Sequence, residues 1–175
     1  MTESLRGSLL IAAPSLFDYF RRSVVLVLEH TEEGAMGVVL NRTSEAEVAE
    51  AVPALAGLVG DGAMVRIGGP VSPDAVVALG EFDDPSEAST HVVGTVGVVD
   101  PERSHSSLRR VRVYAGYAGW GPGQLEGEIE QDAWIVESAS PEDAFRDDDL
   151  WASALSRKGG AYALLATMPS DPSLN

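Results

Sequence analysis

The sequence has 175 residues, of which 45% are hydrophobic and none is cysteine. This length suits a single domain spanning residues 1–175, the apolar fraction excludes an intrinsically disordered chain, and the lack of cysteine excludes disulfides and thiolate metal sites. The net charge of −15, from 27 acidic and 12 basic residues, disfavours direct binding to nucleic acid, which needs clustered Lys and Arg.

Membrane insertion and export are not expected. The longest apolar run, Val24–Leu28, is far shorter than the roughly 20 residues that span a bilayer. The first residues show no charged region followed by an apolar core and a cleavage site. We therefore expect a soluble cytoplasmic protein that makes no membrane contact.

A strand and a hairpin are predicted near the N-terminus. Ser8–Ala12 and Ser23–Glu29 have the pattern of strands, and the second contains an unbroken apolar run, typical of a strand buried on both faces. The polar turn Thr31–Ala35 separates it from another apolar run, Gly37–Leu40. These two runs are therefore predicted to form a hairpin with a long loop.

A helix is predicted after this hairpin, because Ser44-Glu45-Ala46-Glu47 has the pattern of a capping box. Pro53 should bend or restart that helix, since proline lacks a backbone donor and clashes with the preceding turn. Later apolar runs predict four further strands: Val65–Ile67, Ala75–Leu79, Val92–Val99 and Val111–Tyr114.

The segment Gly116–Trp134, GYAGWGPGQLEGEIEQDAW, contains five glycines and two tryptophans. Glycine loses the most backbone freedom on folding, so this density indicates positive φ angles or the close approach of another chain segment. Within it, Pro122–Gln131 is predicted as a short helix with Leu125 and Ile129 on one face. Ala133–Val136 is predicted as a strand.

The C-terminal region predicts helical turns and a last strand. Ser140-Pro141 starts a helix with proline at its first position, and Asp147–Asp149 place negative charge before a second helical segment. Arg157-Lys158 and Gly159 supply the cationic end and the stop of that segment. Tyr162–Ala166 is predicted as a strand. Because strands dominate and helices are not regularly interposed, we expect an α+β fold with a largely antiparallel sheet.

Four segments together resemble the YqgE/AlgH family of bacterial proteins. They are Ser8–Arg42 (SLLIAAPSLFDYFRRSVVLVLEHTEEGAMGVVLNR), Ile67–Val71 (IGGPV), Gly116–Trp134 and Asp171–Asn175 (DPSLN). The resemblance covers nearly the whole chain, and its first and third segments are highly specific. It implies a strongly curved, barrel-like sheet with flanking helices. It implies no reaction, although some members of the family carry the label of transcriptional regulator.

No standard catalytic or cofactor motif is found, so no catalytic residue, cofactor or metal ligand is assigned. The glycines of Gly119–Gly123 miss the dinucleotide-binding spacing, because Gln124 stands where a glycine is required. The histidines lack the spacing of metal ligands and are scattered at His30, His91 and His105.

Two arginines are expected at one end of the predicted hairpin. Antiparallel pairing would bring the start of its first strand beside the end of its second. The residues that meet there would be Arg22, Ser23, Asn41 and Arg42. Two guanidinium groups suit a small anionic ligand or the carboxylate of an unknown partner protein. The alternative is that they pair with the protein's own surplus of acidic side chains.

Further residues match the family's motifs and are assigned structural roles: Glu29, His30, Gly69, Gly119, Trp120, Gln124, Glu126 and Trp134. Glu29 and His30 should lie at the turn end of the hairpin, about 20 Å from the arginines at ~3.3 Å per residue. The two tryptophans are expected to anchor the core, because each can bury about 150–250 Å². The glutamates at 126, 128 and 130 predict a solvated helix face.

Three functions remain open. The favoured one is a non-enzymatic binding or regulatory protein that uses a protein surface or a small-ligand site. A DNA-binding transcriptional regulator is suggested by the family label and opposed by the charge. An enzyme with carboxylate acid/base chemistry would need, for instance, Glu126 close to His30, and nothing in the sequence places these two together.

Overall fold

The computed structural model describes residues 4–16, 19–102 and 106–167, which form one ten-stranded sheet with short helices around it. The strands are β1 (Ser8–Ala12), β2 (Val24–Thr31), β3 (Gly34–Val39), β4 (Thr43–Glu47), β5 (Met64–Ile67), β6 (Val71–Phe82), β7 (Thr90–Val93), β8 (Val96–Val98), β9 (Leu108–Trp120) and β10 (Trp134–Ser138). The helices are α1 (Val48–Ala51), α2 (Gln124–Glu130), α3 (Leu150–Lys158) and α4 (Ala161–Leu165), with 3₁₀ helices η1 (Pro53–Leu58), η2 (Pro85–Glu87) and η3 (Pro141–Phe145).

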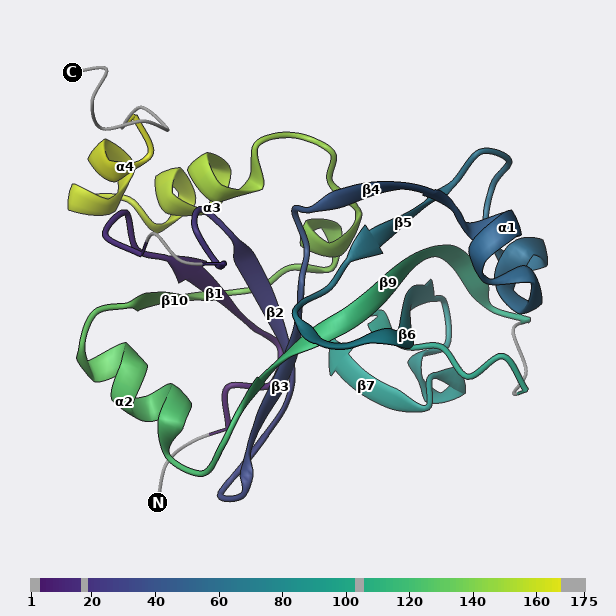
Figure 1. The fold of residues 1–175 in the computed structure, drawn as a ribbon, viewed down its shortest axis with the longest axis horizontal. Helices are drawn as coiled ribbons and strands as arrows, with labels where there is room; N and C mark the ends of the chain where they lie inside the picture. The colour runs from purple at the N-terminus through teal and green to yellow at the C-terminus, as the bar shows by residue number, and fades with distance from the viewer. Residues whose placement is uncertain (1–3, 17–18, 103–105, 168–175) are drawn as a thin grey trace.

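The strand order along the sheet is β10-β1-β2-β3-β9-β6-β8-β7, and the β4–β5 pair branches from β9. Figure 1 shows the long strand β9 connecting the two halves of the molecule. Within the described ranges, every strand pair is antiparallel except β5–β9. The expected α+β fold with a largely antiparallel sheet is confirmed. The sheet is curved. Within the described residues its two end strands, β10 and β7, do not pair with each other, so the sheet is open.

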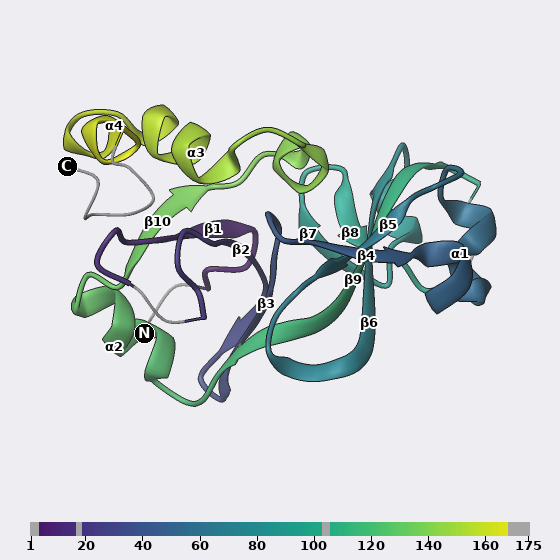
Figure 2. The same ribbon diagram turned by 45° about the horizontal axis from the view of Figure 1, so that its top comes forward.

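Helices cover both faces of the first half of the sheet. In β1, Leu9 and Ile11 belong to the core that includes the buried residues of α3, whereas Leu10 and Ala12 belong to the core that includes Leu125 of α2. Alternate residues of a strand point to opposite faces, so both faces of this strand are apolar. Figures 1 and 2 show α3 and α4 on one side of β1 and β10, and α2 on the other. The prediction that the apolar run of β2 is buried on both faces is confirmed.

The second half of the sheet has its own core beneath α1 and η1. Val48 of α1 and Leu55 of η1 pack with Val65 of β5 and Val113 of β9. Proline starts η1 after α1 has ended, as predicted for position 53. None of the helices in the described ranges is long and apolar enough to cross a membrane.

The predicted capping box at residues 44–47 is wrong, because these residues form strand β4. The Ser44 hydroxyl donates a hydrogen bond to the Val65 carbonyl at 2.5 Å, across the β4–β5 pair. It therefore does not cap a helix, and α1 begins only at Val48. The hydrogen bond between Ser44 and the distant Val65 therefore replaces the helix cap that the local sequence pattern predicts.

Two further predictions of strands need correction. The run Val92–Val99 lies in two strands, β7 and β8, because the chain turns at Gly94 with φ +54°. The segment Tyr162–Ala166 lies largely in helix α4: Gly159 and Gly160 adopt positive φ angles after α3, and the following residues pack beside it as a helix. A short apolar run does not distinguish the two structures by its periodicity. The motif Asp171–Asn175 lies outside the described residues.

The close approach of another segment to the glycine-rich region is confirmed at Gly116. This residue has φ +74°, and a Cβ added there would lie 2.4 Å from the Gly69 carbonyl oxygen. A Cβ added to Gly69 would lie 2.2 Å from the carbonyl carbon and oxygen of Tyr117. The connection between β5 and β6 therefore crosses β9 with no room for side chains. At Gly119, in contrast, the nearest atom to an added Cβ is at an ordinary 3.7 Å.

Candidate anion-binding site

The structure brings Arg22, Ser23 and Asn41 together at one end of the β2–β3 hairpin. The Asn41 side chain accepts a hydrogen bond from the Val24 N–H and donates one to the Arg22 carbonyl, both at 2.9 Å. The Ser23 hydroxyl donates to the Phe20 carbonyl at 2.6 Å. These contacts fasten the loop before β2 to the end of β3.

The guanidinium groups of Arg22 and Arg42 contact different aromatic rings. Arg22 Cζ lies 4.2 Å from the centroid of the Trp151 ring, and Arg42 Cζ lies 4.3 Å from that of Tyr19. Arg42 also donates a hydrogen bond to the Tyr19 carbonyl. A cation over an aromatic face is stabilised by the ring's charge distribution. Each of the two guanidinium groups therefore packs on an aromatic ring.

At the other end of the hairpin, His30 lies buried between the N-terminal segment and α2. The Leu5 N–H donates to His30 Nδ1 at 2.9 Å, and Nε2 lies 3.5 Å from Glu126 Oε1. Because Nδ1 accepts a hydrogen bond, the proton of the neutral ring is on Nε2 and faces the carboxylate. Glu29 is exposed on the same strand. The structure therefore brings His30 and Glu126 together, in a contact that holds the N-terminal segment against α2.

Glu128 of α2 joins the two motif tryptophans. Trp120 Nε1 and Trp134 Nε1 donate to Glu128 Oε1 at 3.0 and 2.9 Å, and Gln124 Nε2 donates to Oε2 at 2.9 Å. The two indole rings lie in the core and pack edge to face with centroids 6.0 Å apart. The prediction of a solvated helix face is therefore wrong for Glu128, because α2 turns this carboxylate toward the buried indoles.

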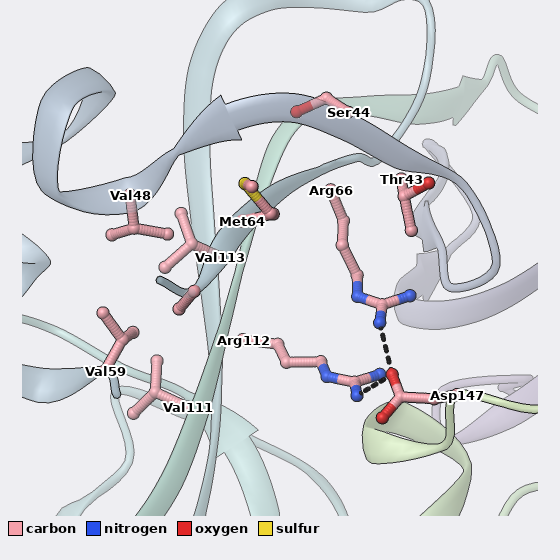
Figure 3. A pocket seen from close by; sticks show the side chains of 11 residues that line it. Thr43, Ser44, Val48, Val59, Met64, Arg66, Val111, Arg112, Val113 and Asp147 are labelled. Carbon is pink, nitrogen blue, oxygen red and sulfur yellow. Dashed lines mark hydrogen bonds and ion pairs between the residues drawn. The ribbon is translucent and has the colours of Figure 1, made fainter. Parts of the chain in front are cut away.

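A cavity of about 480 Å³ lies between the β4–β5 pair, β9 and the connection from η3 to α3. Figure 3 shows valines on one side of it and two arginines that reach toward Asp147 on the other. Its apolar lining is Val48, Val59, Ala63, Met64, Val111 and Val113, and its polar lining is Thr43, Ser44, Arg66, Arg112 and Asp147. The cavity is therefore amphipathic.

Arg66 of β5 and Arg112 of β9 converge on one carboxylate oxygen. Arg66 donates to Asp147 Oδ1 at 2.7 Å, and Arg112 donates to the same oxygen at 2.5 Å. The arginine side chains are only 13% and 17% exposed, whereas that of Asp147 is 77% exposed. Among the described residues, Asp147 is the one carboxylate that forms an ion pair with either arginine. Two cations meeting one anion leave the group with a local charge of about +1.

Backbone carbonyl groups hold both guanidiniums in position. Arg66 Nη1 donates to the Leu40 carbonyl at 3.2 Å. Arg112 Nη1 donates to the carbonyls of Ala144 and Arg146, at 3.4 and 2.9 Å. A guanidinium presents a planar fork of donors that matches a carboxylate or phosphate. The two forks are thus pre-organised for an anion.

No pattern in the sequence distinguishes this arginine pair. Arg66 stands inside the predicted strand Val65–Ile67, and Arg112 inside Val111–Tyr114. The available signal is a charged residue within each short apolar strand, because a largely buried arginine needs a partner. That signal does not reveal that the two strands are neighbours, since β5 and β9 pair in parallel across a long stretch of chain.

Tyr114 lies beside this site, opposite Arg66 in the β5–β9 pair, and is fully buried. Its hydroxyl donates to the Ala144 carbonyl at 3.2 Å and so connects β9 to η3. Burial raises the pKa of Tyr114 to about 12, although the positive charges of Arg112 and Arg66 act in the opposite direction.

This raised pKa predicts a specific loss of stability at high pH. Below pH 10.0, the ordinary pKa of a tyrosine hydroxyl, Tyr114 is protonated in both the folded and the unfolded state, and its contribution to stability is complete. At higher pH the unfolded state loses the proton first, so the folded state is disfavoured as pH rises to about 12. Urea titrations at about pH 8 and about pH 11 measure this effect. Between these two pH values, the free energy of unfolding of wild type should fall by on the order of 1 kcal/mol relative to that of Tyr114→Phe. A difference that does not vary with pH would contradict this prediction.

Comparisons with known proteins agree over nearly the whole chain. Residues 9–163 match the family model described as AlgH-like. A UPF0301 protein from Streptomyces avermitilis is 44% identical over 192 residues, covering 100% of this chain and 98% of the relative. A UPF0301 protein from Mycobacteroides abscessus is 45% identical over 181 residues, covering 97% of this chain and 87% of the relative.

Two solved structures are similar in fold. The crystal structure of a protein from Corynebacterium diphtheriae has a TM-score of 0.86 and 32% sequence identity, over 95% of this chain and 94% of that one. The solution structure of the AlgH protein from Pseudomonas aeruginosa has a TM-score of 0.67 and 28% identity, over 97% and 98%.

Proposed function

The chain belongs to the AlgH-like family, and on that premise we propose that it is a non-enzymatic protein that binds a small anionic ligand. The observation that carries the proposal is the convergence of Arg66 and Arg112 at the polar end of a cavity with apolar walls. The cavity volume, about 480 Å³, lies within the roughly 300–1,000 Å³ typical of small-ligand sites. The proposed ligand therefore carries an anionic group at the arginines and an apolar part toward the valines.

The ion pairs of Arg109 and Arg110 support this proposal over direct DNA binding. Arg109 lies 3.5 Å from a carboxylate oxygen of Asp83. Arg110 pairs with Glu81 at 3.0 Å and with Glu142 at 2.6 Å. Counterion release from DNA requires basic groups that reach phosphates, and these arginines already face carboxylates.

The surroundings of His30 support a binding protein over an acid/base enzyme. Its side chain is only 3% exposed and is engaged by the Leu5 N–H and by Glu126. An acid/base group must come within hydrogen-bond reach of its substrate. The contacts of His30 favour a role in ordering the N-terminal segment.

We expect anion binding to depend on both arginines of the cavity. In titrations monitored by ¹H–¹⁵N NMR, hexanoate is the probe, because it offers a carboxylate with an apolar chain. Arg66→Gln and Arg112→Gln should each weaken hexanoate binding about tenfold or more, since a hydrogen bond to a charged group contributes roughly 1.5–3 kcal/mol.

Arg109→Gln is the matched control, because its guanidinium is 60% exposed and pairs with Asp83 away from the cavity lining. It removes the same charge and should leave hexanoate affinity nearly unchanged. Equal affinities in the three variants and wild type, with thermal melts showing that all are folded, would contradict the proposed site.

A further inference from the structure

We infer that Asp147 is an internal competitor for the cavity, and that the ligand it competes with is a carboxylate bearing an aliphatic chain. The inference rests on the proposed function, because it concerns what enters that same site. Asp147 Oδ1 already occupies the position between Arg66 and Arg112 where a ligand anion would be most strongly attracted. The carboxylate of the protein and that of the ligand therefore cannot occupy this position together.

The exposure of the three side chains explains how a ligand carboxylate would replace that of Asp147. Arg66 and Arg112 are largely buried and held by backbone carbonyls, whereas the side chain of Asp147 is 77% exposed. Rotation of an exposed aspartate costs little packing, because few contacts are lost. The arginines would stay in place while the aspartate side chain moves into solvent and an external carboxylate replaces it.

The side chains of the two residues after Asp147 have partners outside the cavity lining. Asp148 forms an ion pair with Arg146, with its carboxylate oxygens facing Nε and Nη2. The Asp149 side chain accepts a hydrogen bond from the Ala152 N–H at 3.2 Å and so caps α3. Breaking the two ion pairs of Asp147 therefore leaves the cap of α3 intact. Displacement can be confined to one side chain and its immediate backbone.

The cavity walls define the ligand class. The arginines accept a carboxylate in the observed geometry, and the apolar wall opposite them includes the half-buried side chains of Val59 and Val111. A ligand with only an anionic group would leave this wall uncovered. Each buried methylene contributes about 0.8 kcal/mol of transfer free energy, which corresponds to roughly fourfold in affinity. A linear aliphatic carboxylate fits both ends of the cavity.

The test compares hexanoate and acetate titrations of wild type, Asp147→Asn and Asp148→Asn by ¹H–¹⁵N NMR. Asp147→Asn should bind hexanoate about tenfold more tightly than wild type, because the internal carboxylate no longer competes. Asp148→Asn removes the same charge from the adjacent residue and should bind like wild type. In both variants hexanoate should bind more tightly than acetate.

The outcomes separate this inference from the proposed function. If Asp147→Asn binds hexanoate no more tightly than Asp148→Asn, the competitor role is wrong, and arginine-dependent binding remains. Weaker binding to Asp147→Asn would also overturn it, because the aspartate would then position the arginines for the ligand. Equal binding of acetate and hexanoate would overturn the assignment of ligand class. If neither wild type nor Asp147→Asn binds either probe, the proposed function itself fails.

Discussion

Replacing Trp120 by Ala is expected to lower the free energy of unfolding by about 3–5 kcal/mol, the cost usual for removing a large core aromatic. Trp120 is 6% exposed and packs against the Trp134 ring. The variant also removes one of the two indole donors to Glu128 Oε1. Urea unfolding of the purified protein measures the loss.

Trp120→Phe separates the two contributions, because it keeps an aromatic ring and removes the indole N–H. Its free energy of unfolding should lie between those of wild type and Trp120→Ala. Unfolding curves of Trp120→Ala that superimpose on wild type would contradict the assignment of Trp120 to the core, and would favour a role on the adjoining surface beside Glu29.

Where the β5–β6 connection crosses β9, Gly69→Ala is expected to be the most destabilising of the glycine-to-alanine substitutions. The added Cβ would lie 2.2 Å from the Tyr117 carbonyl group, which is backbone of β9 and has no rotamer to change. We expect the free energy of unfolding to fall by roughly 3 kcal/mol or more, because the cost of overpacking adds to the cost of holding an alanine at the φ angle of this position. Thermal melts and the yield of folded protein measure this effect.

Gly119→Ala is the matched control for that substitution. It makes the same chemical change on β9, where the nearest atom to the new Cβ is 3.7 Å away. Its stability should differ from wild type by less than about 1 kcal/mol. Equal melting temperatures for the two variants would show that the crossing at Gly69 tolerates a side chain, and would contradict the described packing.

The sequence predicts those features of the fold whose causes are local. The apolar run of β2 indicates a strand buried on both faces, and the glycines before Pro122 indicate close backbone contact. The partner of Gly116 could not be predicted, because Gly69 belongs to a distant segment that meets it only in the folded sheet. Likewise, Ser44 predicts a helix cap from the sequence pattern, but in the fold its hydroxyl donates a hydrogen bond to the Val65 carbonyl.

The candidate site is less predictable than the fold, because its parts are far apart in sequence. Asp147 is 81 residues from Arg66 and 35 from Arg112, and only the β5–β9 pairing brings the two arginines together. Strand pairing of the first hairpin does place Arg22 near Asn41, as the pattern indicates. The arginine side chains there lie over the rings of Tyr19 and Trp151, which no local pattern connects to them.

The most direct test of the account is a crystal structure of Asp147→Asn soaked in hexanoate. We predict density for the carboxylate within about 2.7–2.9 Å of nitrogen atoms of both Arg66 and Arg112, with the chain extending toward Val59 and Val111. Hexanoate bound elsewhere, or a cavity that stays empty at a concentration that saturates the NMR titration, would contradict the assignment of this cavity as the anion-binding site.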